Sequence, residues 1–302
     1  MTKIARLRRK RFFPDARAQI VVMDRLHQAE MPMHRHEFAE LVIVLSGKAV
    51  HSTGLAKHHL QAGDILFINS SRSHAYEETC ELSLVNILVR EDVFHEAEKE
   101  LGSLPGYHAL FTLEPVRWRQ REFTSHLRLN AADLRQVTAW ADALKAETER
   151  TTEGGTLLAR AWLLLIVGLL ARRYGRDAGD SPHLEMRLGR ALSWIDQNLH
   201  RTIGIGELAA RAAMSERTFL RRFREATGVS PVEYLVRSRI RRAMEFLDRR
   251  TVKLSISEIA SRCGFEDSNY FSRQFRRKTG KSPSEYLVLP GSSSAHSVHR
   301  GP

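Results

Sequence analysis

The feature that most constrains this chain is a segment that occurs twice near its C-terminal end. TGVSPVEYL at 227–235 matches TGKSPSEYL at 279–287, an offset of 52 residues. Upstream, IGELAAR at 205–211 matches ISEIASR at 256–262, an offset of 51 residues. Each copy predicts a short helix, a turn, a second helix, a Thr-Gly stop and the start of a third helix. This is the layout of a helix-turn-helix unit.

The helix boundaries inside the repeat are marked by capping residues. Gly228 and Gly280 stand where a helix is expected to end in a left-handed residue. Two residues after each of them, a Ser-Pro-x-Glu segment begins, which places Ser at an N-cap, Pro at the first helical position and Glu at the third. Three capping boxes are predicted, at 230–233, 255–258 and 282–285.

The second helix of each unit has two distinct faces. Phe219 and Phe223 lie four residues apart, and the second copy repeats this spacing, so one face is expected to lie in a core. The opposite face carries side chains suited to base edges in the major groove, where Arg pairs with guanine, Asn with adenine, and Asp accepts from cytosine. A solvated charged face is the alternative, and its recurrence in two units favours DNA binding. The predicted DNA-binding residues are Arg217, Arg221, Asp267, Asn269 and Arg273.

Charge divides the chain unevenly. From residue 183 to the end there are 22 Lys or Arg against 12 Asp or Glu, whereas residues 12–182 hold 19 against 23. Six further basic residues crowd into 3–11 and form a basic arm. A weakly acidic part followed by a strongly basic part indicates that the second part binds a polyanion such as double-stranded DNA.

The first part of the chain reads as a small β structure followed by helices. LVIVL (41–45), DILFI (64–68) and LSLVNILV (82–89) are short, β-branched runs that predict the strands of a barrel or sandwich. From about residue 131 to 175 apolar residues recur at helical spacing and predict two helices. These helices either pair two subunits or cover the barrel.

Two motifs suggest what the first part binds. HRHEFAELVIVLSG (34–47) resembles the first motif of the cupin barrels, and GDILFINSSRSH (63–74) resembles the second without its usual Pro-x-Gly. His-x-His places both imidazoles on one face of a strand. Such a set can bind Fe, Mn, Ni or Zn, can hydrogen-bond an organic effector, or can be structural. We expect an organic effector and no metal or other cofactor. The predicted effector-binding residues are His34, His36, Glu40, His51 and His74.

With these motifs in place, residues 190–289 resemble the DNA-binding domain of the AraC/XylS family of bacterial transcription regulators. CGFEDSNYFS (263–272) and the His-x-His region are similar to the activators of L-rhamnose operons in particular. The resemblance implies that Asp267 and Asn269, together with two arginines of the first unit, contact bases. It also implies a small effector, with a sugar such as L-rhamnose as the leading choice, a homodimer held by the helices, and recruitment of RNA polymerase as an activator.

The predicted fold class is α+β in two domains, a cupin-like β-barrel with following helices and an all-α domain with two helix-turn-helix units. The predicted boundaries are a basic arm at 1–19, an effector-binding domain at 20–130, a helical dimerisation segment at 131–175, a linker at 176–186, a DNA-binding domain at 187–289 and a flexible tail at 290–302.

Two further features bound the function. Cys80 and Cys263 cannot build a disulfide framework, which fits a reducing cytoplasm. The most apolar stretch, 157–171, is shorter than the roughly 20 residues of a membrane span, so we expect no membrane association. The rival function is a metal-dependent cupin enzyme with a DNA-binding appendage. Because an enzyme has no need of two DNA-binding units, we predict no catalytic residues and no enzymatic activity.

Overall fold

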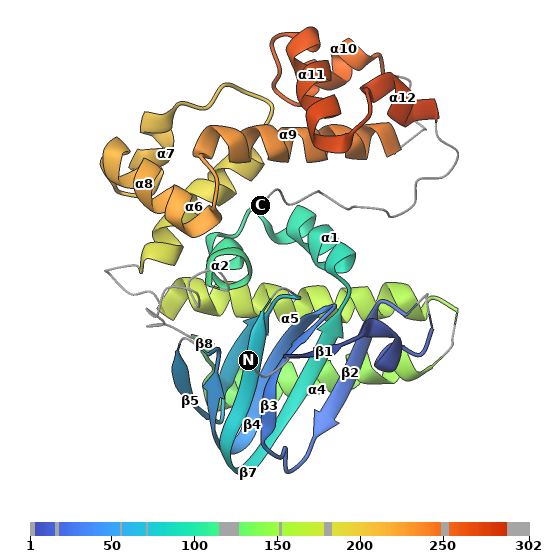
Figure 1. Cartoon of the computed structure of the whole chain (residues 1–302), viewed down its shortest axis with the longest axis vertical. Helices are drawn as coiled ribbons and strands as arrows, with labels where there is room; N and C mark the ends of the chain where they lie inside the picture. Colours follow the sequence, from blue (N-terminus) through green and yellow to red (C-terminus); the bar gives the residue numbers. More distant parts are fainter. Residues whose placement is uncertain are drawn as a thin grey trace. The chain divides into compact units, whose positions relative to one another are not determined.

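The computed structural model describes residues 4–15, 18–54, 56–70, 72–114, 127–150, 153–177, 183–248 and 254–288. The chain divides into two compact units, Met1–Gly189 and Arg190–Pro302, which are described in turn (Figure 1). The predicted tail lies outside the described residues, as does the middle of the predicted linker.

The first unit is built on an eight-stranded sheet whose two long strands pair along their whole length. Their antiparallel register runs from Ala39 opposite Val89 to Ser52 opposite Ala75, with irregularities near the middle. The other strands extend the sheet on either side of this pair (Figure 1). The strands are β1 (Ala5–Leu7), β2 (Ile20–Arg25), β3 (Met31–His36), β4 (Ala39–Ser52), β5 (Lys57–Gln61), β6 (Asp64–Ile68), β7 (Ser73–Val89) and β8 (Leu127–Arg128).

The run LVIVL lies in β4, as predicted, and both of its faces are buried. Leu41 and Ile43 belong to the core beneath the helices, whereas Val42 and Val44 belong to a second cluster on the opposite face of the strand. Successive side chains of a strand point to opposite faces, so a strand covered on both sides is apolar at every position. This double burial explains why the run is continuous rather than alternating.

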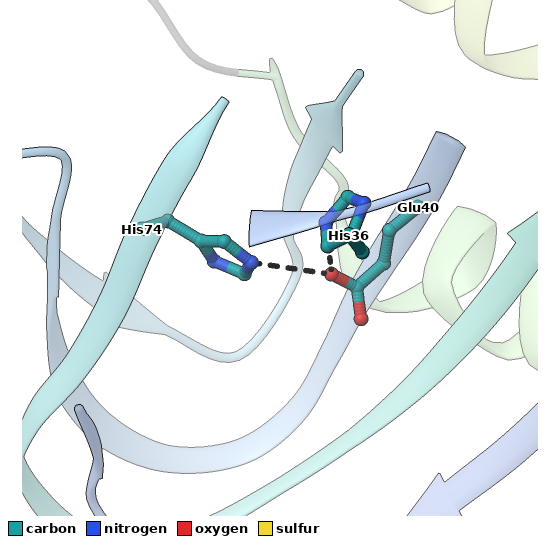
Figure 2. A group of neighbouring side chains, drawn as sticks. All are labelled: His36, Glu40 and His74. Atoms are coloured by element: carbon teal, nitrogen blue, oxygen red, sulfur yellow. Dashed lines mark ion pairs between the residues drawn. The ribbon is translucent and has the colours of Figure 1, made fainter. Parts of the chain in front are cut away.

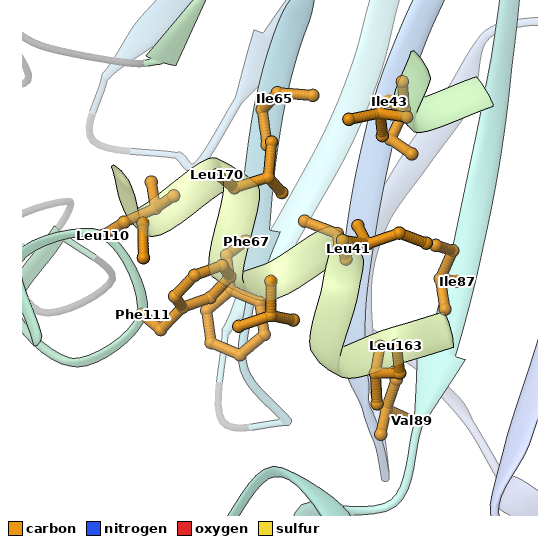
Figure 3. Packing of buried hydrophobic residues seen from close by; sticks show 14 of the residues in the cluster. Leu41, Ile43, Ile65, Phe67, Ile87, Val89, Leu110, Phe111, Leu163 and Leu170 are labelled. Atoms are coloured by element: carbon orange, nitrogen blue, oxygen red, sulfur yellow. The ribbon is translucent and has the colours of Figure 1, made fainter. Parts of the chain in front are cut away.

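Helices cover one face of this sheet. Two lie where the sequence predicted them, and Figure 3 shows Leu163 and Leu170 of the second one in the same core as Leu41 and Ile87 of the sheet. A shorter helical group follows β7, in a part of the predicted effector-binding domain to which the sequence assigned neither helix nor strand. Its side chains Leu110 and Phe111 enter the same core. The helices are α1 (Glu91–Leu101), α2 (Pro105–Tyr107), a π-helical turn (His108–Leu113), α4 (Ala131–Glu149) and α5 (Gly155–Asp177).

One helix, Gly155–Arg176, is long and apolar enough to cross a membrane by length and composition. It extends well beyond the fifteen-residue apolar stretch recognised in the sequence. One side of the helix is fully buried against the sheet, with Ile166, Val167 and Leu170 all 0% exposed. This burial is typical of a core helix, which passes the same test of length and composition.

The second unit is all helical and contains both predicted helix-turn-helix units. α7 (Ile205–Arg211) and α8 (Glu216–Thr227) form the first, and α10 (Ile256–Arg262) and α11 (Ser268–Thr279) form the second. Between them, α9 (Pro231–Asp248) has 18 residues, which corresponds to about 27 Å at 1.5 Å per residue. The unit is flanked by α6 (Leu184–Gln197) and α12 (Pro283–Val288). Because α5 ends at Asp177 and α6 begins at Leu184, the predicted linker is helical at both of its ends.

The predicted caps are largely confirmed. Gly228 and Gly280 both adopt φ of 78° in the left-handed region and end α8 and α11. Reciprocal capping boxes are present at 255–258 and 282–285. At 230–233 only half of the box forms, because the Glu233 carboxylate instead accepts hydrogen bonds from Arg237 and Lys278.

Candidate DNA-binding interface and effector cavity

The buried faces of α8 and α11 are set by phenylalanine pairs, as the sequence predicted. Phe219 and Phe223 are 0% exposed, and their ring centroids lie 5.3 Å apart. Phe271 and Phe275 repeat this arrangement at 5.6 Å. Each pair fixes the rotation of its helix about the helix axis. The polar side chains between the phenylalanines are therefore held toward solvent.

The exposed face of α8 carries two of the predicted DNA-binding residues. Arg217 and Arg221 are both exposed. Arg221 forms an ion pair of 3.2 Å with Glu225 one turn further on, and Arg222 pairs with the same carboxylate at 3.1 Å. To reach a base, the Arg221 guanidinium has to leave Glu225. The predicted base contact of Arg221 therefore competes with an ion pair inside the first unit.

The exposed face of α11 differs from that of α8 in charge. Asn269 and Arg273 are exposed on it, and within Ser268–Thr279 there are four basic residues and no acidic one. Arg277 stands at the position that Glu225 occupies in the first unit, and it pairs with Glu233 of α9 at 3.3 Å. Arg273 makes no ion pair within the described ranges. This face is thus the more basic of the two.

Asp267 has a structural role that the sequence analysis did not assign to it. It is the N-cap of α11, and its two carboxylate oxygens accept from the backbone N–H groups of Asn269 and Tyr270 at 2.8 and 3.1 Å. An N-cap carboxylate satisfies helix donors that otherwise lack partners. Its predicted contact with cytosine stays a prediction that has to use the lone pairs remaining on these oxygens.

Two exposed apolar side chains on these helices were missed by the sequence analysis. Leu220 is 41% exposed beside Arg221 on α8, and Tyr270 is 39% exposed at the start of α11. Apolar side chains in the major groove contact the methyl group of thymine. Leu220 lies three residues after Arg217, a helical spacing that was available in the sequence.

A cavity of about 230 Å³ lies in the first unit. Three predicted residues, His34, His36 and Glu40, line it, whereas the predicted His51 and His74 do not. The sequence analysis missed four polar residues of the cavity wall, Arg25, Gln28, Tyr76 and Asn86. Only Tyr76 could have been predicted, because it follows the predicted His74 by two positions and so lies on the same face of the strand. The full lining is Leu7, Phe12, Met23, Arg25, Gln28, Met31, His34, His36, Phe38, Glu40, Tyr76, Asn86 and Leu88.

Three of the predicted side chains converge at the wall of this cavity. His36 of β3, Glu40 of β4 and His74 of β7 point toward one another from three strands (Figure 2). Glu40 Oε2 lies 3.3 Å from His36 Nε2 and 3.5 Å from His74 Nε2. All three residues are at most 6% exposed. His74 Nδ1 in turn shares a hydrogen bond of 3.2 Å with His51 Nε2.

Burial controls the ionisation of this group. It lowers the pKa of His51 to about 3 and holds the pKa of His74 well below its usual value, with nearby histidines adding to the effect. Burial likewise lowers the pKa of His34, and it raises the pKa of Tyr76 well above its usual value. A low dielectric disfavours the charged form of each group. His34, His51 and His74 are therefore neutral at physiological pH, and the Tyr76 hydroxyl keeps its proton.

The basic arm forms part of the cavity wall. Its strand β1 pairs in parallel with β3, and Arg6 forms an ion pair of 3.0 Å with Glu37. Leu7 and Phe12 line the cavity, and the Phe12 ring lies 5.4 Å from that of Phe38. The described part of the arm is thus held on the sheet by strand pairing, by this ion pair and by the contact of the Phe12 and Phe38 rings.

Comparison with known proteins agrees with a ligand-binding first unit and a DNA-binding second unit. Residues 18–167 match the AraC-like ligand binding domain, and residues 208–288 match a helix-turn-helix domain. The HTH-type transcriptional activator RhaS of Enterobacter sp. (strain 638) is 31% identical over 91% of this chain and 94% of its own. This chain belongs to the AraC family of transcription regulators.

The AraC-family chain is also similar to further relatives and to parts of solved structures. RhaS of Escherichia fergusonii is 32% identical over 91% of the chain and 94% of its own. Among solved structures, the DNA-binding domain of AdpA in complex with a target DNA is 39% identical over 34% of this chain and 90% of its own, with a TM-score of 0.32. ToxT from Vibrio cholerae is 14% identical over 89% of this chain and 97% of its own, with a TM-score of 0.35. The AraC-family chain is a DNA-binding regulator with an N-terminal ligand-binding domain.

Proposed function

We propose that this AraC-family regulator is a cytoplasmic homodimer that activates transcription when a small polyhydroxylated effector, such as L-rhamnose, binds in the cavity of its first unit. In this proposal α8 and α11 each bind one major-groove segment, and the bound regulator recruits RNA polymerase. The names of its relatives, transcriptional activators called RhaS, support activation over repression. The chain acts by binding alone and not by catalysis.

The observation that carries the effector proposal is a set of buried polar atoms facing the cavity without hydrogen-bond partners. Tyr76 Oη and Asn86 Oδ1 make no hydrogen bond within the part of the chain that the structure describes, and both residues line the cavity. Buried polar atoms nearly always have partners in native proteins. A ligand that both donates and accepts, as sugar hydroxyls do, supplies them.

The apolar side of the cavity fits the same ligand class. Phe12 and Phe38 also line the cavity, and their ring centroids lie 5.4 Å apart. Small-molecule sites combine apolar walls with a few polar groups that fix orientation. A pyranose has an apolar face of C–H groups and a rim of hydroxyls, so it matches both sides. The volume of about 230 Å³ is adequate for one monosaccharide.

Exposed leucines on α5 support a second copy of this chain as the dimer partner. Leu157 is 72% exposed, and Leu158 and Leu165 are 48% and 47% exposed. Leu158 and Leu165 lie seven residues apart, so they share one face of the helix. Large apolar side chains gathered on one exposed helix face are typical of an interaction surface.

The rival function, a metal-dependent enzyme, lacks comparable support. The AraC-family relatives are transcription factors over more than nine tenths of their length. The second unit, with its two exposed basic helix faces, has no role in an enzyme acting on a small molecule.

DNase footprinting upstream of the genes that neighbour this regulator tests the proposal, with and without a panel of sugars. The expected result is two protected major-groove segments per subunit, whose occupancy changes with one sugar. Thermal unfolding provides the second readout, because a ligand at 100 times its Kd stabilises the folded state by about 2.7 kcal/mol. Tyr76→Phe removes a single hydroxyl and is expected to shrink this shift while keeping the fold. A sugar panel that shifts neither readout contradicts the effector proposal.

A further inference from the structure

The spacing of the three converging side chains does not suit direct hydrogen bonding. The Glu40 oxygen lies 3.3 Å and 3.5 Å from the two imidazole nitrogens, whereas charge-assisted N–H···O bonds are about 2.7–2.9 Å long. Neither contact qualifies as a hydrogen bond, and both Nε2 atoms lack hydrogen-bond partners within the described residues. Something besides a shared proton is needed to satisfy these atoms.

The same distances are those expected around a metal ion. Two ligand atoms at about 2.1 Å from one ion, separated by a tetrahedral angle, lie about 3.4 Å apart. The observed separations fall on either side of this value. One ligand atom from each of His36, Glu40 and His74 lies within 4.8 Å of the others. Two nitrogens and one oxygen therefore lie close enough together for one ion to bind among them.

The surroundings of His36 orient it as a metal ligand. Its Nδ1–H donates to the backbone oxygen of Phe38 at 2.6 Å. Because a carbonyl oxygen only accepts, the ring proton is held on Nδ1 and the lone pair of Nε2 faces Glu40. Metal-binding histidines in proteins are oriented by such a hydrogen bond from the second ring nitrogen.

His74 is held in a similar way from behind. Its Nδ1 is hydrogen-bonded to His51 Nε2 at 3.2 Å, and His51 is 0% exposed. This bond fixes the direction in which His74 Nε2 points, which is toward Glu40 (Figure 2). His51, predicted from the sequence as an effector-binding residue, is thus placed to orient a ligand rather than to touch the effector.

We propose that His36 Nε2, Glu40 Oε2 and His74 Nε2 bind one divalent first-row transition-metal ion of the zinc type, with an open coordination position toward the cavity. Two imidazoles and a carboxylate suit Zn²⁺ and its neighbours in the series, whereas Mg²⁺ and Ca²⁺ prefer oxygen ligands throughout. The open position follows from the lining of the cavity, which includes His36 and Glu40 but not His74.

The ion gives the effector site a means of selection, and this part of the inference rests on the proposed function. A hydroxyl pair on the effector that reaches the open position binds the ion as well as Tyr76 and Asn86. Sugars with hydroxyls in another configuration lose that bond. The metal is thus an anchor for the effector, and its removal is expected to weaken effector binding without affecting the helix-turn-helix units.

Titration of the full-length, tag-free and metal-stripped protein with Co²⁺ tests the site, because tetrahedral Co²⁺ has a characteristic visible absorption. The expected result is saturation at one Co²⁺ per chain, followed by loss of the absorption when Zn²⁺ is added. Glu40→Gln and His74→Gln keep side-chain size and remove a ligand. Each is expected to weaken binding by more than about tenfold, since loss of even an outer-shell partner costs 10- to 100-fold.

A matched control distinguishes the site from adventitious binding. His27 lies on the surface, 3.1 Å from Glu81, and its side chain is 75% exposed. His27→Ala is expected to bind Co²⁺ like the wild type. Equal affinity in the wild type and the two ligand variants, or an equal loss in the control, overturns the proposal. Circular dichroism checks that each variant is folded.

The titration of the wild type tests the proposal even if Glu40→Gln or His74→Gln fails to fold. A wild type that shows no absorption saturating at one Co²⁺ per chain overturns the proposed metal site. The titration contains neither sugar nor DNA. Its failure leaves the proposed regulator intact, and a failed footprint leaves the metal site intact.

Discussion

Asn269→Ala separates base recognition from general DNA affinity more cleanly than any other change in this chain. The Asn269 side chain is exposed near the start of α11, on the face opposite Phe271 and Phe275. Its backbone N–H is bonded to Asp267, a bond that alanine keeps. Removing the amide therefore deletes no core atom and breaks no hydrogen bond of the described structure.

The expected magnitude follows from this isolation. Surface changes away from packed or capped positions alter the free energy of unfolding by about 0.5 kcal/mol or less. A bidentate contact to adenine contributes about 1–3 kcal/mol of discrimination, which corresponds to a loss of roughly 5- to 150-fold in operator affinity. Affinity for random DNA should change far less, because the basic residues of the domain supply the phosphate contacts.

Fluorescence anisotropy with an operator duplex and a scrambled duplex of the same length measures both affinities at one salt concentration. Arg273→Ala serves as the matched comparison on the same helix face, where a full charge is removed. It should lower the affinity for both duplexes and flatten the salt dependence. Thermal unfolding confirms that both variants are folded.

The reasoning fails if Asn269→Ala weakens operator and scrambled DNA equally. In that case the amide contacts the backbone of DNA or nothing at all, and α11 is rotated relative to the groove in a way that the positions of the phenylalanines do not predict. A loss confined to the operator, at an adenine position, supports base recognition.

Three further predictions concern the second unit. Phe223→Ala empties a 0% exposed position and should destabilise the first helix-turn-helix unit by about 3–5 kcal/mol, seen as a lower urea midpoint and as loss of binding to operator and random DNA alike. Burial raises the pKa of the Cys263 thiol to about 12. Iodoacetamide at pH 8 should therefore label only the exposed Cys80 in the folded protein and both thiols after unfolding. Labelling of both thiols in the folded protein would contradict the burial of Cys263. Hydrogen bonds from Lys278 and Arg237 hold the pKa of Glu233 below the usual 4.5 although burial opposes them. A carboxyl group whose pKa is lowered by folding stabilises the folded state at pH values above its pKa in the unfolded chain. This stabilisation is lost as the pH falls through its pKa in the folded protein. The difference in unfolding free energy between the wild type and Glu233→Gln should therefore be present at pH 7 and shrink below pH 4.5. A difference that does not change with pH would show that the ion pairs of Glu233 contribute nothing to stability.

Local sequence signals predicted the second unit well because its structure depends on local rules. The spacing of Phe219 and Phe223 fixed which face of α8 is buried, and the Ser-Pro-x-Glu segments marked helix starts without reference to the rest of the chain. Where two local roles competed, the prediction was incomplete. Asp267 was assigned to base recognition, yet both of its oxygens already accept from the backbone of α11.

The cavity was harder to predict because it depends on contacts between distant strands. Alternation along β3 placed His34 and His36 on one face, and both line the cavity. Asn86 lies opposite Val42 in the register of β7 against β4, and it lines the cavity. Arg25 is brought in by the pairing of β2 with β7. No short-range pattern in the sequence encodes either of these registers.

The two-sided burial of β4 makes this strand a mechanical link. Glu40 faces the cavity, and the next residue, Leu41, packs against the core that holds Leu163 of α5 (Figure 3). Close-packed interiors transmit a displacement instead of absorbing it. If the proposed effector moves Glu40, the movement therefore reaches Leu41 and the core that Leu41 shares with α5. In the proposed function the route from the cavity to α5 is then the peptide unit between Glu40 and Leu41, followed by the packing of Leu41.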